Sequence, residues 1–360
     1  MNAEREQLCD LLRDLRPTAV PVTQAVIELA REEGLHILLA DRLRPPALED
    51  ERRAAAVIGA AREAELRTLL EALAEAGVRP ILIKGCALAY THYPRPELRP
   101  RDDTDLMILE SDREAVARTA ASLGYLRPPE TEGELITAQV HFYKRDRAGI
   151  VHALDVHWGI SNVRAFAGAL SYDELARDAI PLPALGASAR GASAMHALLI
   201  ACLHRVAHHA DSANLLWLYD IHLLARGRDP DAAAFAALAS GRGMRAVCVR
   251  SLTLADEAFG GIDPSWIAAL SIPDTAGNPE PSAAFLEGPL SLAGILKADL
   301  KATPGWSTRA RLVREHLFPP RAFMFERYET RRAAALPFLY LHRIVSGAPK
   351  WLRHGRRGRG

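Results

Sequence analysis

The chain has 360 residues, of which 49% are hydrophobic and 25% charged, and its formal net charge is +1. This length allows two or three domains with a sizeable core, and the near-neutral charge argues against a dedicated nucleic-acid-binding protein. The four cysteines are widely spaced and form no CxxC pair, which is typical of free thiols in a reducing compartment. Because there is no signal segment and no apolar run near the ~20 residues that cross a bilayer, we expect a cytoplasmic protein without a membrane span.

Residues 1–77 are predicted to form a helical N-terminal segment. Leucines recur at helical spacing from Leu66 to Leu73, and Gly77 suits the left-handed residue that closes a helix. The prolines at positions 45 and 46 divide this segment into two helical parts.

Residues 78–165 change in character and predict a small mixed sheet with helices packed on it. A buried strand ends at Lys84, a short helix covers 86–93, and a second strand opens at Asp103. Ser111 and Glu114 form a capping-box pattern for a helix that Gly124 ends. Segments 139–144 and 150–158 are typical of paired strands around a turn at 146–149.

Residues 166–350 predict a helical C-terminal domain, so the expected fold class is α+β. Its clearest helices are at 192–209, 213–225 and 232–240, and proline-rich loops are expected at 272–290 and 319–320. Residues 351–360 are basic and glycine-rich, which predicts a disordered, solvated tail.

Three aspartates are the main indication of a metal site in this sequence. Asp103 and Asp105 alternate along a strand and therefore share one face, where two carboxylates repel each other unless a cation lies between them. Hard oxygen ligands of this kind favour Mg²⁺. Asp155, within another strand-like segment, also needs a partner or a cation. The alternative is that Asp103 and Asp105 cap the strand and pair with Arg99 or Arg101.

The turn at Lys84 and Gly85 lies where a strand passes into a helix. Glycine lets the backbone approach a ligand, and the amides of a helix N-terminus bind phosphate. Lys84 would add a positive charge for a triphosphate, although a tight turn with a surface lysine gives the same pattern. Arg99, beside the acidic strand, is expected to bind phosphate or to neutralise Asp102 and Asp103.

Histidines offer a competing metal site. His204 and His208 are four residues apart on a predicted helix, and with His209 and Asp211 they suggest a metal-dependent phosphohydrolase. The HExxH glutamate is missing, so ordinary packing histidines are the favoured interpretation. His157 either shares the metal face with Asp155 or is a satisfied strand histidine.

Segment 81–108, with its KG-x-A-L-x-x-x-x-Y spacing and its R-P-x-x-D-x-D-L ending, resembles a bacterial nucleotidyltransferase-like family of largely uncharacterised proteins. That family belongs to the DNA polymerase β-type nucleotidyltransferase superfamily. The resemblance extends to a D-x-H-W element at 155–158 and an L-x-W-L-x-D-like segment at 215–220.

The resemblance implies a small polymerase-β-like sheet that binds Mg²⁺ or Mn²⁺ and a nucleoside triphosphate. Asp103, Asp105 and Asp155 would be the catalytic carboxylates and the metal ligands. The cofactor-binding residues would be Lys84, Gly85, Cys86 and Arg99. The superfamily's loop usually carries Gly-Gly or Gly-Ser, whereas this chain has Cys86 after Gly85, and a thiol is a poor hydrogen-bond donor.

The sequence therefore predicts a Mg²⁺-dependent nucleotidyltransferase that transfers a nucleoside monophosphate to a hydroxyl and releases pyrophosphate. The acceptor is expected to be a small molecule or a protein side chain, with nucleic acid the least favoured. The alternative is a catalytically inactive protein of the same fold that senses nucleotides or acts as a scaffold.

Overall fold

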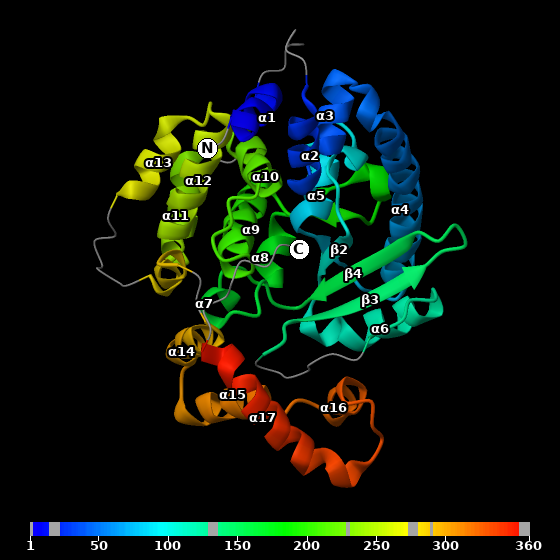
Figure 1. Ribbon diagram of the computed structural model, residues 1–360, viewed down its shortest axis with the longest axis vertical. Helices are drawn as coiled ribbons and strands as arrows, with labels where there is room; N and C mark the ends of the chain where they lie inside the picture. Colours follow the sequence, from blue (N-terminus) through cyan, green and yellow to red (C-terminus); the bar gives the residue numbers. More distant parts are fainter. Residues whose placement is uncertain are drawn as a thin grey trace.

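The computed structural model describes residues 3–13, 22–128, 136–227, 231–272, 280–288 and 291–352. It is an α+β protein in which helices surround one mixed sheet, as the sequence predicted (Figure 1). No helix within these ranges is long and apolar enough to cross a membrane. Most of the basic tail, residues 353–360, and part of the proline-rich loop, residues 273–279, lie outside the described residues.

The sheet consists of β1 (Ile81–Leu82), β2 (Asp103–Met107), β3 (Gln139–Arg145), β4 (Val151–His157), β5 (Ile180–Pro181) and β6 (Arg190–Gly191). Their spatial order is β3-β4-β2-β1-β6-β5. β2 pairs in parallel with β4 and antiparallel with β1, while β1 pairs in parallel with β6. The sequence predicted β3 and β4, but β5 and β6 have two residues each, too few to show a strand periodicity.

The hairpin of β3 and β4 follows from the turn that joins the two strands. Gly149 adopts a left-handed backbone with φ of 85°, which glycine tolerates without strain. The amide of Ile150 donates a hydrogen bond of 2.9 Å to Oδ1 of Asp146. The turn residues thus fix the antiparallel register in which His141 lies opposite Asp155.

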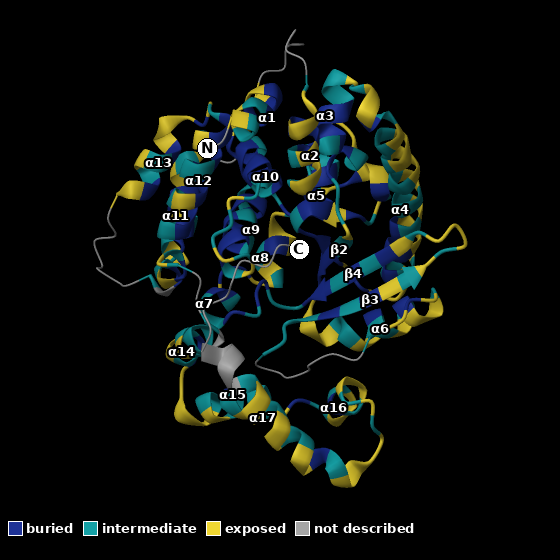
Figure 2. Cartoon of the chain, viewed as in Figure 1, coloured by how far each residue is buried: buried dark blue, intermediate teal, exposed yellow. Residues whose placement is uncertain are grey.

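Each face of the sheet buries its own hydrophobic core (Figure 2). On one face, Leu106 and Leu154 pack with α4 (Glu49–Glu75), which contributes the leucines predicted at helical spacing, and with α6 (Arg113–Ser122). Met107 belongs to the other core, which joins the N-terminal and C-terminal helices. Alternation along β2 therefore directs its apolar residues to both cores.

The N-terminal helices confirm the predicted division around the prolines. α1 (Ala3–Arg13), α2 (Gln24–Glu32) and α3 (His36–Leu43) precede a short 3₁₀ turn that leads into α4. Arg44 ends α3 in a left-handed conformation with φ of 52°. Gly77, after α4, has φ of 81°, as expected of a residue that closes a helix.

The capping box predicted at Ser111 and Glu114 does not form, although the helix does. Ser111 lies inside a 3₁₀ turn (Glu110–Asp112), so it is not the residue that flanks α6, and no side chain caps that helix. A capping box forms instead where Ser171 precedes α8 (Tyr172–Arg177). There the serine stands outside the helix in an extended conformation, as the motif requires.

The predicted C-terminal helices are present as α9 (Ala194–Ala207), α10 (Leu215–Ala225) and α11 (Ala232–Gly241). Polar side chains cap all three N-termini, which explains their sharp starts. Further helices in this part of the chain are α7 (Arg164–Ala167), α12 (Arg245–Phe259) and α13 (Pro264–Ser271).

The last helices form a projection at one end of the molecule (Figure 1). They are α14 (Leu292–Ala302), α15 (Trp306–Leu317), α16 (Arg321–Arg327) and α17 (Leu336–Leu352). α14 packs against α7 and α17, and α16 packs against α17. We call residues 292–352 the C-terminal projection.

Candidate active site

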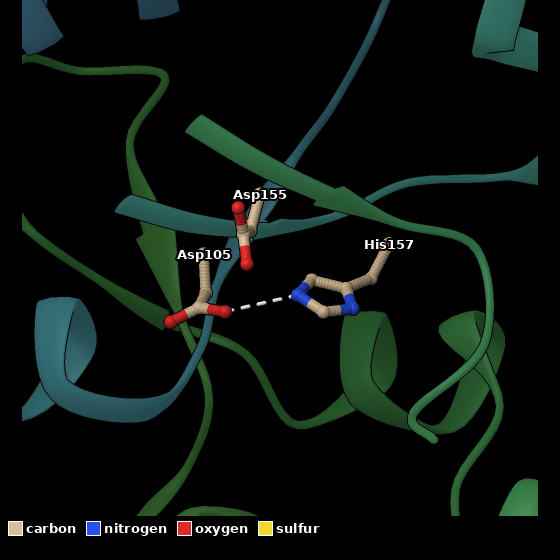
Figure 3. Close-up of side chains that lie close together, drawn as sticks. All are labelled: Asp105, Asp155 and His157. Carbon is tan, nitrogen blue, oxygen red and sulfur yellow. Dashed lines mark hydrogen bonds and ion pairs between the residues drawn. The ribbon is translucent and has the colours of Figure 1, made fainter. Parts of the chain in front are cut away.

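The parallel pairing of β2 and β4 brings two aspartates from distant parts of the chain side by side. Asp105 lies directly opposite Asp155 in this pairing, and Asp103 and His157 lie two residues away on their respective strands. Because side chains alternate between faces, all four share one face of the sheet. Figure 3 shows Asp105, Asp155 and His157 pointing toward one another from the two strands.

Asp105, Asp155 and His157 form the tightest group of potential metal ligands. Each offers one ligand atom, and these atoms lie within 4.8 Å of one another. Nε2 of His157 is 2.9 Å from Oδ1 of Asp105. The sequence predicted Asp103 as the third member, but in the part of the chain that the structure describes His157 takes that place.

Lys84 is the cation of this cluster. Its ammonium donates a hydrogen bond of 2.6 Å to Oδ1 of Asp105 and lies 3.4 Å from Nε2 of His157. Lys84 begins α5 (Lys84–Thr91) with φ of 53°, a left-handed conformation that is strained for lysine. Asp105 therefore pairs with Lys84, and not with Arg99 or Arg101 as in the alternative interpretation of the sequence.

Charge and burial shift the pKa values of Asp103 and Asp105, the two aspartates of β2, in opposite directions. Burial would raise the pKa of Asp105, but the Lys84 charge and the His157 hydrogen bond hold it well below its usual value. For Asp103 the lowering effect of the Lys84 charge is smaller. Burial, followed by repulsion from Asp105 and Asp155, raises its pKa to about 6. A cation close to these carboxylates would relieve that repulsion.

His141 on β3 is a site residue that the sequence analysis missed. It lies opposite Asp155 in the hairpin, and its Nδ1 hydrogen-bonds Oδ1 of that aspartate. Gln139, two residues earlier on the same face, places its amide nitrogen 3.1 Å from Nε2 of His141. Gln139 and His141 alternate along the predicted strand and therefore share one face. This pattern identifies His141 as a site residue only when the register that pairs it with Asp155 is known.

Arg99 is held from the opposite side of the site by a residue of α10. Its guanidinium makes hydrogen bonds of 2.7–3.2 Å to both carboxylate oxygens of Asp220. Tyr93 donates a further hydrogen bond of 2.7 Å to Asp220. Arg99 therefore pairs with Asp220, rather than with Asp102 or Asp103 as the sequence suggested.

Gly85 makes room for this arginine. A Cβ atom at this position would lie 2.9 Å from three atoms of the Arg99 guanidinium, so a larger residue would displace an arginine that Asp220 holds in place. The next residue, Cys86, is fully buried in the core on the other face of the sheet, where burial raises the pKa of its thiol. Its side chain does not line the cavity that the other predicted residues share.

Most of the residues described above line one cavity of about 510 Å³, although His141 and His157 do not. Lys84, Gly85 and the three aspartates line one side. α9 and α10, with the segment between them, contribute His204, His208, His209 and Trp217. The cavity lining therefore combines carboxylates from the sheet with imidazole and indole rings from the helical region.

The imidazoles facing the carboxylates are uncharged near neutral pH. Burial, and then the charge of Lys84, lowers the pKa values of His204, His208 and His209, that of His208 to about 4. The ring centroids of His209 and Trp217 are 3.9 Å apart. This part of the lining is therefore aromatic and neutral, a surface suited to stacking with a planar ring.

The histidines do not form the alternative metal site that their spacing suggested. Nε2 of His204 lies 3.0 Å from Nε2 of His209, whereas Nε2 of His208 lies 3.2 Å from the hydroxyl of Ser161. Within the described ranges, none of them belongs to a group of three potential ligands. Asp211 instead pairs with the buried Arg205 and with Arg250.

Comparison with known proteins assigns the chain to a family. No curated protein matches the chain significantly. A family model described as "uncharacterised nucleotidyltransferase" matches residues 22–260, which include the sheet, the cavity and the helices of its aromatic lining. The chain therefore belongs to this family of nucleotidyltransferases.

Proposed function

We propose that the protein transfers a nucleoside monophosphate from a nucleoside triphosphate to a hydroxyl acceptor, with Mg²⁺ or Mn²⁺ as the cofactor. The observation that carries this proposal is the pairing of Asp105 with Asp155 on adjacent parallel strands, at the wall of the cavity. Carboxylates that converge from neighbouring strands are what metal-assisted transfer requires.

The donor set fits a divalent cation. Asp105 and Asp155 supply hard oxygen atoms, and Asp103 lies on the same face with a pKa raised to about 6 by burial and by its acidic neighbours. The Lys84 ammonium, 2.6 Å from Asp105, already marks this place as one that attracts positive charge. When bound, the cation would neutralise charge on the triphosphate and polarise its phosphorus–oxygen bonds.

The start of α5 would hold the phosphates. Ile83, which precedes the helix, has no side chain able to cap it, and no side-chain cap is made. The first amides of a helix are free to bind an anion in that case. Gly85 lets the Arg99 guanidinium lie over the start of this helix, so that Lys84 and Arg99 both add positive charge to the cavity lining.

The remaining residues would activate the acceptor hydroxyl and stack with the nucleobase or with a planar acceptor. Asp155 would accept the proton of the attacking hydroxyl, and its hydrogen bond with His141 orients the carboxylate and offers a route for that proton. The neutral rings of His209 and Trp217 would stack with the nucleobase or with a planar acceptor.

One observation favours a second function. Because the Lys84 ammonium forms an ion pair with Asp105, the cavity is also suited to a protein that binds a nucleotide without turning it over. Such a protein would act as a nucleotide sensor or scaffold and would not depend on the proton-accepting role of Asp155.

An assay with labelled nucleoside triphosphates distinguishes the nucleotidyltransferase from the nucleotide sensor. We expect pyrophosphate release with at least one of ATP, GTP, CTP and UTP in the presence of Mg²⁺ or Mn²⁺, and transfer of label to an added hydroxyl compound or to the protein. Asp105→Asn and Asp155→Asn should each lower this rate at least about a hundredfold, since several kcal/mol of charge stabilisation are lost. Asp112→Asn, on the 3₁₀ turn outside the cavity, is the matched control. Nucleotide binding without pyrophosphate release, unchanged in Asp155→Asn, would support the sensor.

A further inference from the structure

Charge is distributed unevenly along this nearly neutral chain. Residues 303–360 contain 13 arginines and lysines but three acidic residues, a formal charge of +10. Since the whole chain carries +1, residues 1–302 carry −9. Such an asymmetry indicates that the basic part meets a polyanionic partner or surface. The described portion of this basic segment lies in the C-terminal projection, outside the residues that the nucleotidyltransferase family model matches.

The same segment exposes large apolar side chains. Phe338, Leu341 and Val345 on α17 are 79%, 58% and 65% exposed. Their spacing of three and four residues places them in one stripe along the helix. Trp306, the first residue of α15, is 84% exposed. Five of the eleven exposed large hydrophobic side chains in the described residues lie between positions 306 and 345, so the concentration is local.

α17 is apolar on its inner side as well. Leu336 is buried, and Tyr340 packs its ring 5.5 Å from that of Phe318 while its hydroxyl donates to the backbone of Pro319. A helix that is apolar on both sides is normally covered on both sides. The inner side of α17 packs within the protein. The outer stripe of Phe338, Leu341 and Val345 therefore indicates that the helix also contacts an apolar environment outside the protein.

We propose that the C-terminal projection binds the surface of an anionic membrane, with the outer stripe of α17 inserted among the lipid headgroups. Apolar side chains that insert, arginines that meet anionic headgroups and tryptophan at the boundary are the features of interfacial helices. The aliphatic side chains of Leu341 and Val345 have no counterpart in the recognition of RNA, which relies on aromatic stacking and polar contacts. A symmetric dimer formed through this stripe would bring two segments of +10 charge close together, and the two would repel. This proposal is independent of the proposed catalytic activity.

Sedimentation of the full-length protein with vesicles tests the proposal. We expect binding to vesicles of phosphatidylcholine with phosphatidylglycerol, little binding to phosphatidylcholine alone, and weaker binding as the salt concentration rises. The double variant Phe338→Gln with Leu341→Gln should bind about tenfold more weakly or worse, because two inserted side chains are lost. Arg331→Glu with Arg332→Glu should also weaken binding, and only to the anionic vesicles.

The matched control is Val57→Gln with Leu126→Gln, which removes exposed apolar side chains of 67% and 58% exposure elsewhere on the molecule. It should bind vesicles like the unmodified protein, and circular dichroism should show that all three double variants are folded. Vesicle binding that the Phe338 and Leu341 changes leave intact would overturn the proposal. So would tight binding to RNA with none to anionic vesicles, or a dimer in solution that these two changes convert to monomers.

Discussion

The ammonium of Lys84 lies 2.6 Å from Oδ1 of Asp105, and both side chains are largely buried, with 15% and 6% exposure. The pair thus places a positive charge of the protein itself beside the carboxylates that we propose as metal ligands. In the absence of metal this charge stabilises Asp105, and on metal binding it would compete with the cation or move toward the phosphates.

Replacing Lys84 by methionine separates these effects. Without metal, Lys84→Met should lower the free energy of unfolding by ~3 kcal/mol, because it leaves a buried carboxylate without its main partner. The stabilisation that added Mg²⁺ gives should become larger, since no ammonium competes for Asp105. Denaturant unfolding with and without Mg²⁺ measures both quantities.

Lys144→Met is the matched control for this variant. Lys144 also makes an ion pair of 2.7 Å, with Glu65, away from the cavity and with more exposure. Its loss should cost about 1 kcal/mol or less and should leave the effect of Mg²⁺ unchanged. An equal response to Mg²⁺ in the unmodified protein and in Lys84→Met would show that the ammonium does not occupy the metal position.

The stability of the metal-free protein should depend on pH through Asp103. Its folded-state pKa of about 6 exceeds the ordinary value of 3.8, so the group lowers stability as pH rises from about 4 through 6. Asp103→Asn removes this penalty and should stabilise the metal-free protein by up to about 3 kcal/mol at pH 8. The gain should be much smaller at pH 4. Thermal or urea unfolding at the two pH values checks this, and an equal gain at both would contradict it.

Gly85 should not tolerate a side chain. In Gly85→Ala the new Cβ would press on a guanidinium that Asp220 holds in place, so we expect a loss of about 1–3 kcal/mol in stability and lower nucleotide affinity. Gly168→Ala is the control, because a Cβ there has no neighbour within 4 Å. Its stability should change by about 0.5 kcal/mol or less. Similar effects at the two positions would exclude a specific role for the close approach of Arg99.

The Arg99 and Asp220 pair should couple strongly in a double-mutant cycle. Asp220→Asn or Arg99→Met alone leaves a buried charge unpaired and should cost about 3–5 kcal/mol, whereas the double variant should regain much of this stability. Tyr93→Phe removes one hydrogen bond to Asp220 and should cost about 1 kcal/mol. If Arg99 contacts phosphate, the stable double variant will still bind nucleotide weakly. Additive unfolding energies for the two single changes would show that the pair is not coupled.

Local sequence patterns predicted the elements that carry the site, but not all of their contacts. The alternation around Asp103 and Asp105 predicted β2, and the turn at 146–149 predicted the β3–β4 hairpin, because both depend on neighbours in sequence. Asp105 and Asp155 meet through parallel pairing of strands about fifty residues apart. We expected such a meeting because carboxylates in strands need a partner or a cation and because metal-assisted transfer uses converging carboxylates, and the resemblance implied the same three residues.

The partners of charged residues were the hardest to predict. Arg99 was expected to face the acidic strand, yet it pairs with Asp220, 121 residues away on α10. Lys84 was expected to bind a triphosphate, yet its ammonium donates a hydrogen bond to Asp105. In both cases the choice among several acidic residues depends on burial and strand register, which no short motif encodes.

The opposite charges of the two parts of the chain have a consequence for how the molecule moves. An acidic body joined to a basic end constitutes a large electric dipole. Near any negatively charged object, such a molecule rotates before it makes contact, and its basic end arrives first. If the projection binds an anionic membrane as we propose, the acidic body that contains the cavity would face away from the membrane surface.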